Sequence, residues 1–168
     1  MLTLIWCQDL QGAIGLGNDL LFSIPEDMKH FRETTRGNTV VMGRNTWFSL
    51  PEKVRPLPGR KNVVLTSDKN VDSYRGATVV RSVEKILDIA KEEHVYVIGG
   101  GKLYDSLTDQ ADSLVVTVVQ TNAESADTFA PSWSLIEERF SISERSGLIA
   151  SENGLGFEIL YFSKKNHL

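Results

Sequence analysis

The chain has 168 residues and a mass of 18.7 kDa, a length that suits one domain spanning residues 1–168. Hydrophobic residues make up 41% and charged residues 24% of the sequence, a balance that excludes disordered, collagen-like and coiled-coil proteins. The net charge of −4 argues against a nucleic-acid-binding protein, and the lack of a long apolar run argues against a membrane protein.

The single cysteine and the three histidines bear on compartment and metal binding. Cys7 has no partner for an intrachain disulfide, and the Cys and His residues show none of the spacings that zinc sites require. Residues 1–7 lack the basic start and the cleavage site of a signal peptide. We therefore expect a cytoplasmic protein without a metal site, and a monomer because no apolar surface helix requires a partner.

Eight segments rich in β-branched and aromatic residues predict strands. In chain order they cover residues 2–7, 39–43, 61–66, 77–80, 95–99, 114–120, 139–145 and 156–163. Several are continuous apolar runs, as expected of interior strands in a parallel sheet that is covered on both faces. The last two follow each other without a helix between them, and we expect them to pair antiparallel.

Four segments with a helical spacing of apolar residues lie between these strands. They cover residues 25–35, 44–50, 83–93 and 101–107. Strands that alternate with helices predict an α/β protein with an eight-stranded, mostly parallel central sheet, an antiparallel C-terminal strand and about four flanking helices. Residues 8–24 contain three glycines and no clear period, so we interpret them as a lid or binding loop.

Asp27 is the most informative single residue. Pro25 fits the first turn of the first predicted helix, and Ser23 is placed to cap it. Helical spacing puts Asp27 on the apolar face of this helix, together with Met28 and Phe31. A carboxylate on an apolar face must find a partner, bind a ligand or raise its pKa. The alternative is an ordinary first-turn acid that the helix dipole favours.

Positive charge is concentrated in residues 36–81. This segment carries nine basic and three acidic side chains, a net charge of +6, which leaves −10 for the rest of the chain. Such a segment within an acidic protein indicates recognition of an anionic ligand by local charge pairing. The alternative is a solvated surface with a chance excess of cations.

Two glycine-containing turns from strand to helix are candidate phosphate sites. Residues 43–46 (Gly-Arg-Asn-Thr) and residues 99–101 (three glycines) each lie between a predicted strand and a predicted helix. The first turn of a helix presents free backbone N–H groups to a phosphate, and glycine permits a close approach. Neither turn matches the GxGxxG pattern of dinucleotide-binding folds, and the Gly-Arg pair also occurs in ordinary turns.

Taken together, these residues resemble the dihydrofolate reductase family of the bacterial chromosomal type over nearly the whole chain. The resemblance rests on the order and spacing of six segments: 14–15 (IG), 24–28 (IPEDM) with Phe31, 41–47 (VMGRNTW), 55–65 (RPLPGRKNVVL), 98–104 (IGGGKLY) and 127–129 (DTF). It implies the fold of that family, the reduction of 7,8-dihydrofolate to tetrahydrofolate, and NADPH as hydride donor. Antifolate inhibitors are expected to compete for the substrate site.

The resemblance also implies roles on the substrate side. Asp27 would hydrogen-bond the pterin ring and favour a proton on N5, with Thr117 supporting it from a neighbouring strand. Arg60 would clamp a carboxylate of the glutamate tail, with Arg55 nearby, and Tyr104 would border the nicotinamide. The walls of the pterin and aminobenzoyl pocket would be Ile5, Met28, Phe31, Leu57 and Ile98.

On the cofactor side, the resemblance implies contacts with each part of NADPH. The backbones of Cys7 and Ile14 would hold the carboxamide, and a cis peptide would join Gly99 to Gly100. The 2′-phosphate would meet Arg44, Thr66, Ser67 and Arg81. The other phosphates would lie against Gly43, Arg44, Asn45 and Thr46 and against Gly99, Gly100, Gly101, Lys102 and Leu103. Further cofactor contacts are expected from Ala13, Gly15, Asn18, Asp19, Leu65 and Tyr104.

One departure from the family and two alternatives stay open. Leu21 and Phe22 stand where most relatives have Pro-Trp, which removes an indole N–H and leaves the route of the proton open. The first alternative is a pyrimidine reductase of riboflavin biosynthesis, whose substrate lacks a glutamate tail and would leave Arg60 without a purpose. The second is a protein that binds NADPH without catalysis, which only the Leu21–Phe22 departure favours.

Overall fold

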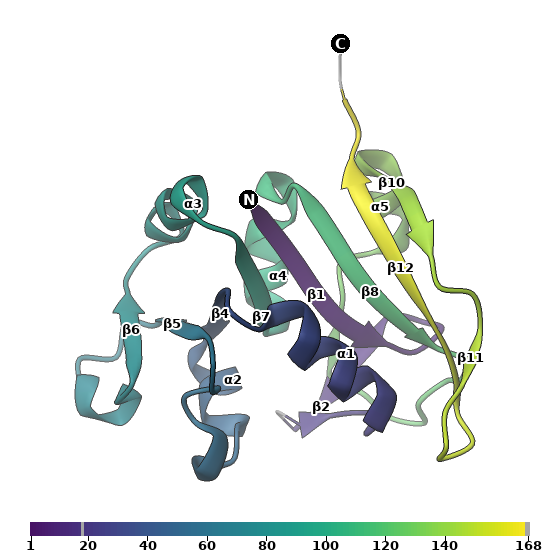
Figure 1. Ribbon diagram of the computed structural model, residues 1–168, viewed down its shortest axis with the longest axis horizontal. Helices are drawn as coiled ribbons and strands as arrows, with labels where there is room; N and C mark the ends of the chain where they lie inside the picture. Colours follow the sequence, from purple (N-terminus) through teal and green to yellow (C-terminus); the bar gives the residue numbers. More distant parts are fainter. Residues whose placement is uncertain (18, 167–168) are drawn as a thin grey trace.

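A main sheet of nine strands crosses the molecule in the computed structural model, which describes residues 1–17 and 19–166 (Figure 1). All eight strands expected from the sequence are present: β1 (Leu2–Gln8), β4 (Thr39–Gly43), β5 (Lys61–Leu65), β6 (Ala77–Val80), β7 (Val95–Gly99), β8 (Ser113–Val119), β10 (Phe140–Arg145) and β12 (Gly156–Lys164). Their order across the sheet is β10-β12-β8-β1-β7-β4-β5-β6. The ninth strand, β11 (Ile149–Ala150), pairs with β12.

The directions of these strands match the expected α/β class. The six neighbouring strands from β8 to β6 in the sheet order run parallel. β12 lies antiparallel to both β8 and β10, so the pairing predicted for the last two long strands is confirmed. The sheet is therefore parallel around β1 and antiparallel only at its C-terminal edge.

A second, smaller sheet lies where the sequence predicts only a lid or binding loop. It consists of β2 (Ala13–Leu16), β3 (Asp19–Leu20) and β9 (Thr128–Phe129), in the order β3-β2-β9. The interpretation of residues 8–24 was therefore incomplete. Strands of two to four residues are too short to show an alternating pattern, and the partner β9 comes from a distant part of the chain.

Five α-helices lie within the described residues, which corrects the expectation of about four. The predicted ones are α1 (Pro25–Thr35), α2 (Arg44–Ser49), α3 (Val83–Glu92) and α4 (Gly101–Leu107). The fifth, α5 (Trp133–Arg139), begins after Ser132, whose side chain accepts a hydrogen bond from the backbone N–H of Leu135. Unlike the short helices α2 and α4, it does not connect two parallel strands of the sheet, so the alternation of strands and helices did not indicate it.

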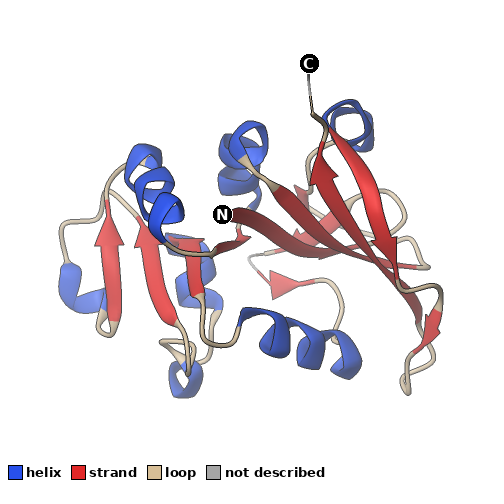
Figure 2. Ribbon diagram, turned by 45° about the horizontal axis from the view of Figure 1, so that its top comes forward, coloured by secondary structure: helices blue, strands red, loops and turns tan. Residues whose placement is uncertain are grey.

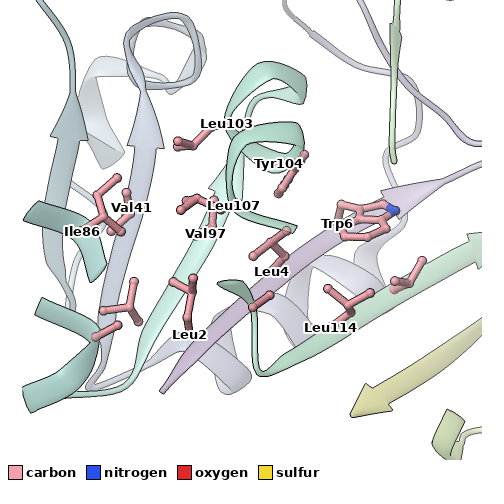
Figure 3. Close-up of a cluster of buried hydrophobic side chains, with 14 of the residues drawn as sticks. Leu2, Leu4, Trp6, Val41, Ile86, Val97, Leu103, Tyr104, Leu107 and Leu114 are labelled. Carbon is pink, nitrogen blue, oxygen red and sulfur yellow. The ribbon is translucent and has the colours of Figure 1, made fainter. Parts of the chain in front are cut away.

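The helices cover both faces of the main sheet (Figure 2). Each face has its own hydrophobic core. On one face, Leu103, Tyr104 and Leu107 of α4 point toward β1 and β7 (Figure 3). α3 and α5 contribute to the same core. On the other face, Phe31 of α1 and Trp47 of α2 pack in the second core. Burial on both faces explains why the parallel strands have continuous apolar sequences.

Alternation along β1 decides which side chains reach which core. Leu4 and Trp6 belong to the core under α3 and α4, whereas Ile5 and Cys7 belong to the core on the face of α1. The odd-numbered residues of β1 therefore point toward the helix that carries Asp27.

The strands β1 and β7 pair only over their first halves, and the sheet opens beyond that point. Their register ends at Leu4 and Val97. β7 then carries Ile98 as an extra residue without a partner on β4, which is a β-bulge. The opening lies at the carboxyl ends of parallel strands, the edge at which α/β sheets bind their ligands.

Neither a membrane span nor a metal cluster is found in the part of the chain that the structure describes. Each helix there is too short or too polar to cross a membrane. No three His, Cys, Asp or Glu side chains within those residues group in a way that could hold a metal ion.

Candidate active site

Helix α1 carries Asp27 to the place where Thr117 of β8 pairs with Cys7 near the carboxyl end of β1. Pro25 is the first helical residue, and Ile24 is the N-cap without a side-chain hydrogen bond. The expected cap, Ser23, does not act as one, because its hydroxyl lies 3.9 Å from the Met28 sulfur instead. Asp27 occupies the first turn, where the positive end of the helix dipole favours a carboxylate.

A buried threonine holds the Asp27 carboxylate. Thr117 lies on β8 and is 2% exposed, and its hydroxyl donates a 2.6 Å hydrogen bond to Oδ1 of Asp27. Burial raises the pKa of Asp27 above its ordinary value, and the hydrogen bond from Thr117 and the charge of the nearby His30 partly oppose that rise. A carboxyl group of this kind can accept hydrogen bonds from a ligand and can take part in proton transfer.

An apolar cleft surrounds Asp27. Its lining residues are Cys7, Ile14, Leu20, Leu21, Phe22, Ile24, Asp27 and Met28. The apolar residues just before α1 were not predicted as site residues, although their place directly before Pro25 was a signal that they lie close to Asp27. Because the walls are hydrophobic, they limit the access of water to the carboxylate, in agreement with its raised pKa.

His30 follows Asp27 by one helical turn and was not predicted as a site residue. Its half-buried ring meets the Tyr161 ring edge-on, with the centroids 6.3 Å apart. Its Nε2 atom has no hydrogen-bond partner among the described residues. Burial lowers the pKa of His30, while the charge of Asp27 acts in the opposite direction. The i, i+3 spacing of the two residues was the signal available in the sequence.

The residues expected to wall the substrate pocket differ in exposure. Ile5 and Leu57 are buried, Phe31 and Ile98 are half-buried, and Met28 is exposed. All except Met28 belong to the core on the face of α1 or pack against it. The structure therefore gathers four of the five on one face of the sheet, and Met28 lines the cleft from the exposed side of α1.

Arg60 is joined to α1 by two contacts. Its guanidinium lies 5.9 Å from the centroid of the Phe31 ring and donates a 3.1 Å hydrogen bond to the Thr35 hydroxyl. Burial, together with the charges of Arg32 and Arg36, lowers the pKa of Arg60. Within the described residues none of these three arginines forms an ion pair. A group of cations without carboxylate partners favours an anionic ligand at this place.

Arg55 contacts a different helix from Arg60. Its guanidinium lies 5.7 Å from the ring centroid of Trp47 and 5.5 Å from that of Phe48, both on α2. It also forms an ion pair with Glu52 at 3.7 Å. The two arginines expected near the glutamate tail are thus held by separate elements, and only Arg60 is attached to the helix that carries Asp27.

The strand β2 brings three expected cofactor contacts against β1: Ala13, Ile14 and Gly15. All of them are buried. Asp9, which was not predicted, fixes the turn before β2 by accepting hydrogen bonds from the backbone N–H groups of Gln11 and Ala13, each at 2.9 Å. Asn18 lies outside the described residues, and Asp19 is described only as part of β3.

The starts of α2 and α4 approach each other closely. Their N-caps are Gly43 and Gly100, and neither start has a side-chain cap, so the N–H groups of both first turns are open to a ligand. A Cβ atom on Gly43 would lie 3.9 Å from the Gly100 nitrogen and from the Gly99 oxygen. Gly99 has a φ of +134°, and the peptide that joins it to Gly100 is cis, as the resemblance implies. The geometry can hold two neighbouring phosphates.

The side chains of the two first turns differ in exposure. Asn45 and Lys102 are exposed, Thr46 is half-buried, and Leu103 is part of the core. Gly101 is tightly packed, because a Cβ there would lie 2.8 Å from Cγ2 of Thr128. Leu65 ends β5 and is half-buried. These residues therefore lie along the same carboxyl edge of the sheet as the two glycine turns.

Tyr104 connects α4 to β1 at the level where β1 no longer pairs with β7. Its hydroxyl donates a 2.7 Å hydrogen bond to the backbone carbonyl of Ile5. Burial raises the pKa of Tyr104, so this hydroxyl stays protonated and can donate. The ring is 3% exposed and packs against Trp6, with centroids 5.3 Å apart. Tyr104 thus supports one side of the opening.

The four residues expected at the 2′-phosphate are brought together around the end of β5. Arg81 donates to the backbone carbonyl of Thr66 at 2.8 Å and to that of Asp68 at 2.5 Å. Arg44 forms an ion pair with the Asp68 carboxylate at 3.7 Å. Ser67, which directly precedes Asp68, is exposed. Asp68 was not predicted, although an acid within a positive segment was a signal that it pairs with an arginine.

The comparison with known proteins agrees with this geometry. A family model described as dihydrofolate reductase matches residues 1–164. The chain is 47% identical over 133 residues to the dihydrofolate reductase of Mycobacterium tuberculosis (strain ATCC 25618 / H37Rv), covering 78% of this chain and 80% of that protein. It is 35% identical over 171 residues to the dihydrofolate reductase of Bacillus subtilis (strain 168), covering 99% and 96%. A solved structure of the dihydrofolate reductase from Enterococcus faecalis, complexed with NADP(H) and RAB-propyl, matches with a TM-score of 0.87 at 32% identity, covering 99% of this chain and 97% of that one.

Proposed function

The chain belongs to the dihydrofolate reductase family, and we propose on that premise that it reduces 7,8-dihydrofolate to 5,6,7,8-tetrahydrofolate with NADPH. The observation that carries the proposal is the Asp27 carboxylate, which Thr117 holds in an apolar cleft near the carboxyl end of β1. In the overall reaction, dihydrofolate, NADPH and a proton give tetrahydrofolate and NADP⁺. Family membership also favours this reaction over the pyrimidine reductase and the non-catalytic binding protein.

Asp27 is the group that would hold the pterin ring. Its Oδ1 accepts the hydrogen bond from Thr117, and the remaining acceptor sites of the two oxygens can bind the amino group and ring nitrogen of the pterin. The raised pKa means that Asp27 binds a proton more readily than an exposed aspartate does. Asp27 would thereby favour the protonation of N5, directly or through a water molecule.

Arg60 would bind the other end of the substrate. Its guanidinium is fixed against Phe31 and Thr35 of α1, the helix that also carries Asp27. A guanidinium can bind a carboxylate through two parallel hydrogen bonds. The apolar residues between Asp27 and Arg60 would then contact the aminobenzoyl group and keep water away from the ring.

The residues present fit NADPH, which supplies the hydride for C6 of the dihydropterin when it is bound. The uncapped starts of α2 and α4 would bind its phosphates through backbone N–H groups, and Gly43 leaves the space that a Cβ would fill. Arg44 and Arg81 would bind the 2′-phosphate. The backbones of Cys7 and Ile14 would hold the carboxamide at the cleft.

The test of this function compares the parent protein with Asp27→Asn. NADPH and dihydrofolate are mixed with each protein, and the loss of NADPH absorbance is followed over a range of pH. We expect turnover by the variant to fall about 10²–10⁴-fold at neutral pH, the usual contribution of a proton-transfer group, with near-normal NADPH binding. The loss should be smaller at low pH, where the substrate arrives already protonated.

The matched control is Asp88→Asn, which removes an exposed carboxylate from α3. It should leave turnover unchanged. Equal activity of Asp27→Asn and the parent at neutral pH would contradict the role of Asp27. A parent protein that binds NADPH but does not oxidise it with dihydrofolate would contradict the proposed reaction itself.

Three expectations from the sequence accompany this proposal. Antifolates should compete with dihydrofolate for the cleft around Asp27. The cytoplasmic location and the monomeric state stay predictions. Sedimentation of the purified protein tests the monomeric state.

A further inference from the structure

Cys7 lies directly beside Thr117 in the main sheet. The parallel register of β1 and β8 pairs Cys7 with Thr117, and paired residues of two strands point to the same face. The Thr117 side chain points toward α1, because its hydroxyl reaches Asp27. Cys7 therefore faces the same carboxylate, and both Cys7 and Asp27 line the cleft.

We propose that Cys7 is a positioning residue whose S–H group donates a second hydrogen bond to the Asp27 carboxylate, beside the bond from Thr117. The thiol lies in the same cleft as the carboxylate, beside the paired Thr117, and Cys7 is half-buried there. Its effect on catalysis rests on the proposed function, because Asp27 is the group through which Cys7 acts. The hydrogen bond itself does not depend on that function.

The groups that face Asp27 come from three elements. Thr117 from β8 donates a hydrogen bond, Cys7 from β1 donates another, and His30 from α1 acts through its charge. Tyr104 belongs to the core on the opposite face of the sheet, where its hydroxyl donates to the backbone carbonyl of Ile5. Phe22 also lines the cleft, but its ring has no N–H or O–H group to donate. Among these described neighbours, Cys7 and Thr117 are thus the two donors.

The surroundings keep the thiol in its donating form. Burial, and after it the negative charge of Asp27, raises the pKa of Cys7 far above its usual range. At neutral pH the group is therefore a neutral S–H and neither a thiolate nor a nucleophile. The hydrogen bond from Cys7 in turn stabilises the charged form of Asp27 and lowers the pKa of that carboxyl group.

The experiment measures the titration of Asp27 in three variants of the full-length protein. Carbon NMR of isotope-labelled aspartate follows the side-chain carboxyl group, and Asp27→Asn identifies its resonance. Cys7→Ala removes the donor, Cys7→Ser replaces it by a hydroxyl donor, and Thr117→Val removes the shorter hydrogen bond as a reference. Because a thiol is a weak donor, we expect Cys7→Ala to raise the pKa of Asp27 by about half a pH unit, less than Thr117→Val does.

The sign of the change separates a hydrogen bond from simple packing. If Cys7 only filled space, Cys7→Ala would admit water to the carboxylate and lower its pKa. A rise in Cys7→Ala that Cys7→Ser reverses supports the proposal. An unchanged or lowered pKa in Cys7→Ala, or a rise that Cys7→Ser does not reverse, overturns it.

The pH dependence of turnover distinguishes this proposal from the proposed function. If Asp27 governs proton transfer, the turnover profile of Cys7→Ala should move to higher pH together with the NMR titration, and that of Cys7→Ser should move back. A shifted titration with an unmoved turnover profile would retain the hydrogen bond from Cys7 and contradict the role of Asp27 in the reaction.

Discussion

The two halves of the candidate site hold their charged groups in different ways. Asp27 is half-buried, and its carboxylate accepts a hydrogen bond from a threonine that is itself 2% exposed. Around Arg44, the side chain is 55% exposed, and its partner Asp68 is 28% exposed. The first half is built on strands β1 and β8 and helix α1, whereas the second lies on the turns that follow β4, β5 and β6.

This difference indicates how each half would do its work. In the buried half, a single hydrogen bond can shift the pKa of one carboxyl group, since little solvent is present to screen the interaction. In the exposed half, several cations share the binding of one anion, and each contribution is weakened by solvent and salt. Substitutions in the two halves should therefore differ in size and in salt dependence.

After the loss of turnover expected for Asp27→Asn, the largest effect is expected at Arg60, which is attached to the helix that carries Asp27. Arg60→Leu should raise the KM for dihydrofolate about 10–100-fold, because a charge-assisted hydrogen bond contributes roughly 1.5–3 kcal/mol. Steady-state kinetics at fixed NADPH would measure it, and kcat should change less than KM. Arg55→Leu is the matched control with a much smaller expected rise, because Arg55 contacts α2 and Glu52. Equal rises in KM for the two substitutions would contradict the binding of the substrate carboxylate by Arg60.

The next effect concerns the glycine turn before α4, which would bind a phosphate of the cofactor. Gly99→Ala should lower the free energy of unfolding by about 1–3 kcal/mol, because its φ of +134° disfavours other residues and the new Cβ would lie 3.1 Å from Oγ1 of Thr46. It should also weaken NADPH binding, which fluorescence titration measures. Gly100→Ala is the control, since Gly100 has a φ of −94° and its Cβ would be 3.5 Å from the same atom. If both variants were equally stable, backbone conformation at Gly99 would not matter.

A smaller effect is expected on stability at Asp27. Because burial raises its pKa above the ordinary 3.8, the contribution of Asp27 to stability is fully present below that pH and is lost as the pH rises through the folded-state pKa. Asp27→Asn should therefore raise the free energy of unfolding at neutral pH by about 1 kcal/mol, and the gain should disappear in acid. Urea unfolding of the parent and the variant at several pH values measures the gain at neutral pH and its disappearance in acid. A gain that increases toward acid would contradict the direction of the pKa shift.

The smallest effect is expected at Arg44, in the exposed half. Arg44→Leu should reduce the preference for NADPH over NADH about fivefold, because an exposed ion pair contributes up to about 1 kcal/mol. The reduction should be less marked at high salt, which screens exposed charges. Arg75→Leu removes an exposed arginine from the same positive segment and should leave the preference unchanged. An unaltered preference in Arg44→Leu would count against contact with the 2′-phosphate.

Much of the frame of this protein can be predicted from the sequence. The eight long strands and the four helices α1 to α4 show local patterns of apolar residues, and such patterns depend only on neighbours in the chain. Asp27 is conspicuous for the same reason, as an acid on the apolar face of α1. The three glycines at 99–101 were predicted as a phosphate site from their place between a strand and a helix, whereas the role of Arg60 depended on the resemblance to a family.

Only the tertiary structure decided which residues meet at Asp27. The hydrogen bond from Thr117 to this carboxylate, and the place of Cys7 beside Thr117, depend on the pairing of β1 with β8, and a register joins segments that are far apart in the chain. The small sheet of β2, β3 and β9 and the pairing of Arg44 with Asp68 could not be predicted either, because their partners are also far apart in the chain. The sequence by itself determined which segments become strands and helices, through local periodicity. Burial, and with it the raised pKa of Asp27, arises only when those segments pack and exclude water.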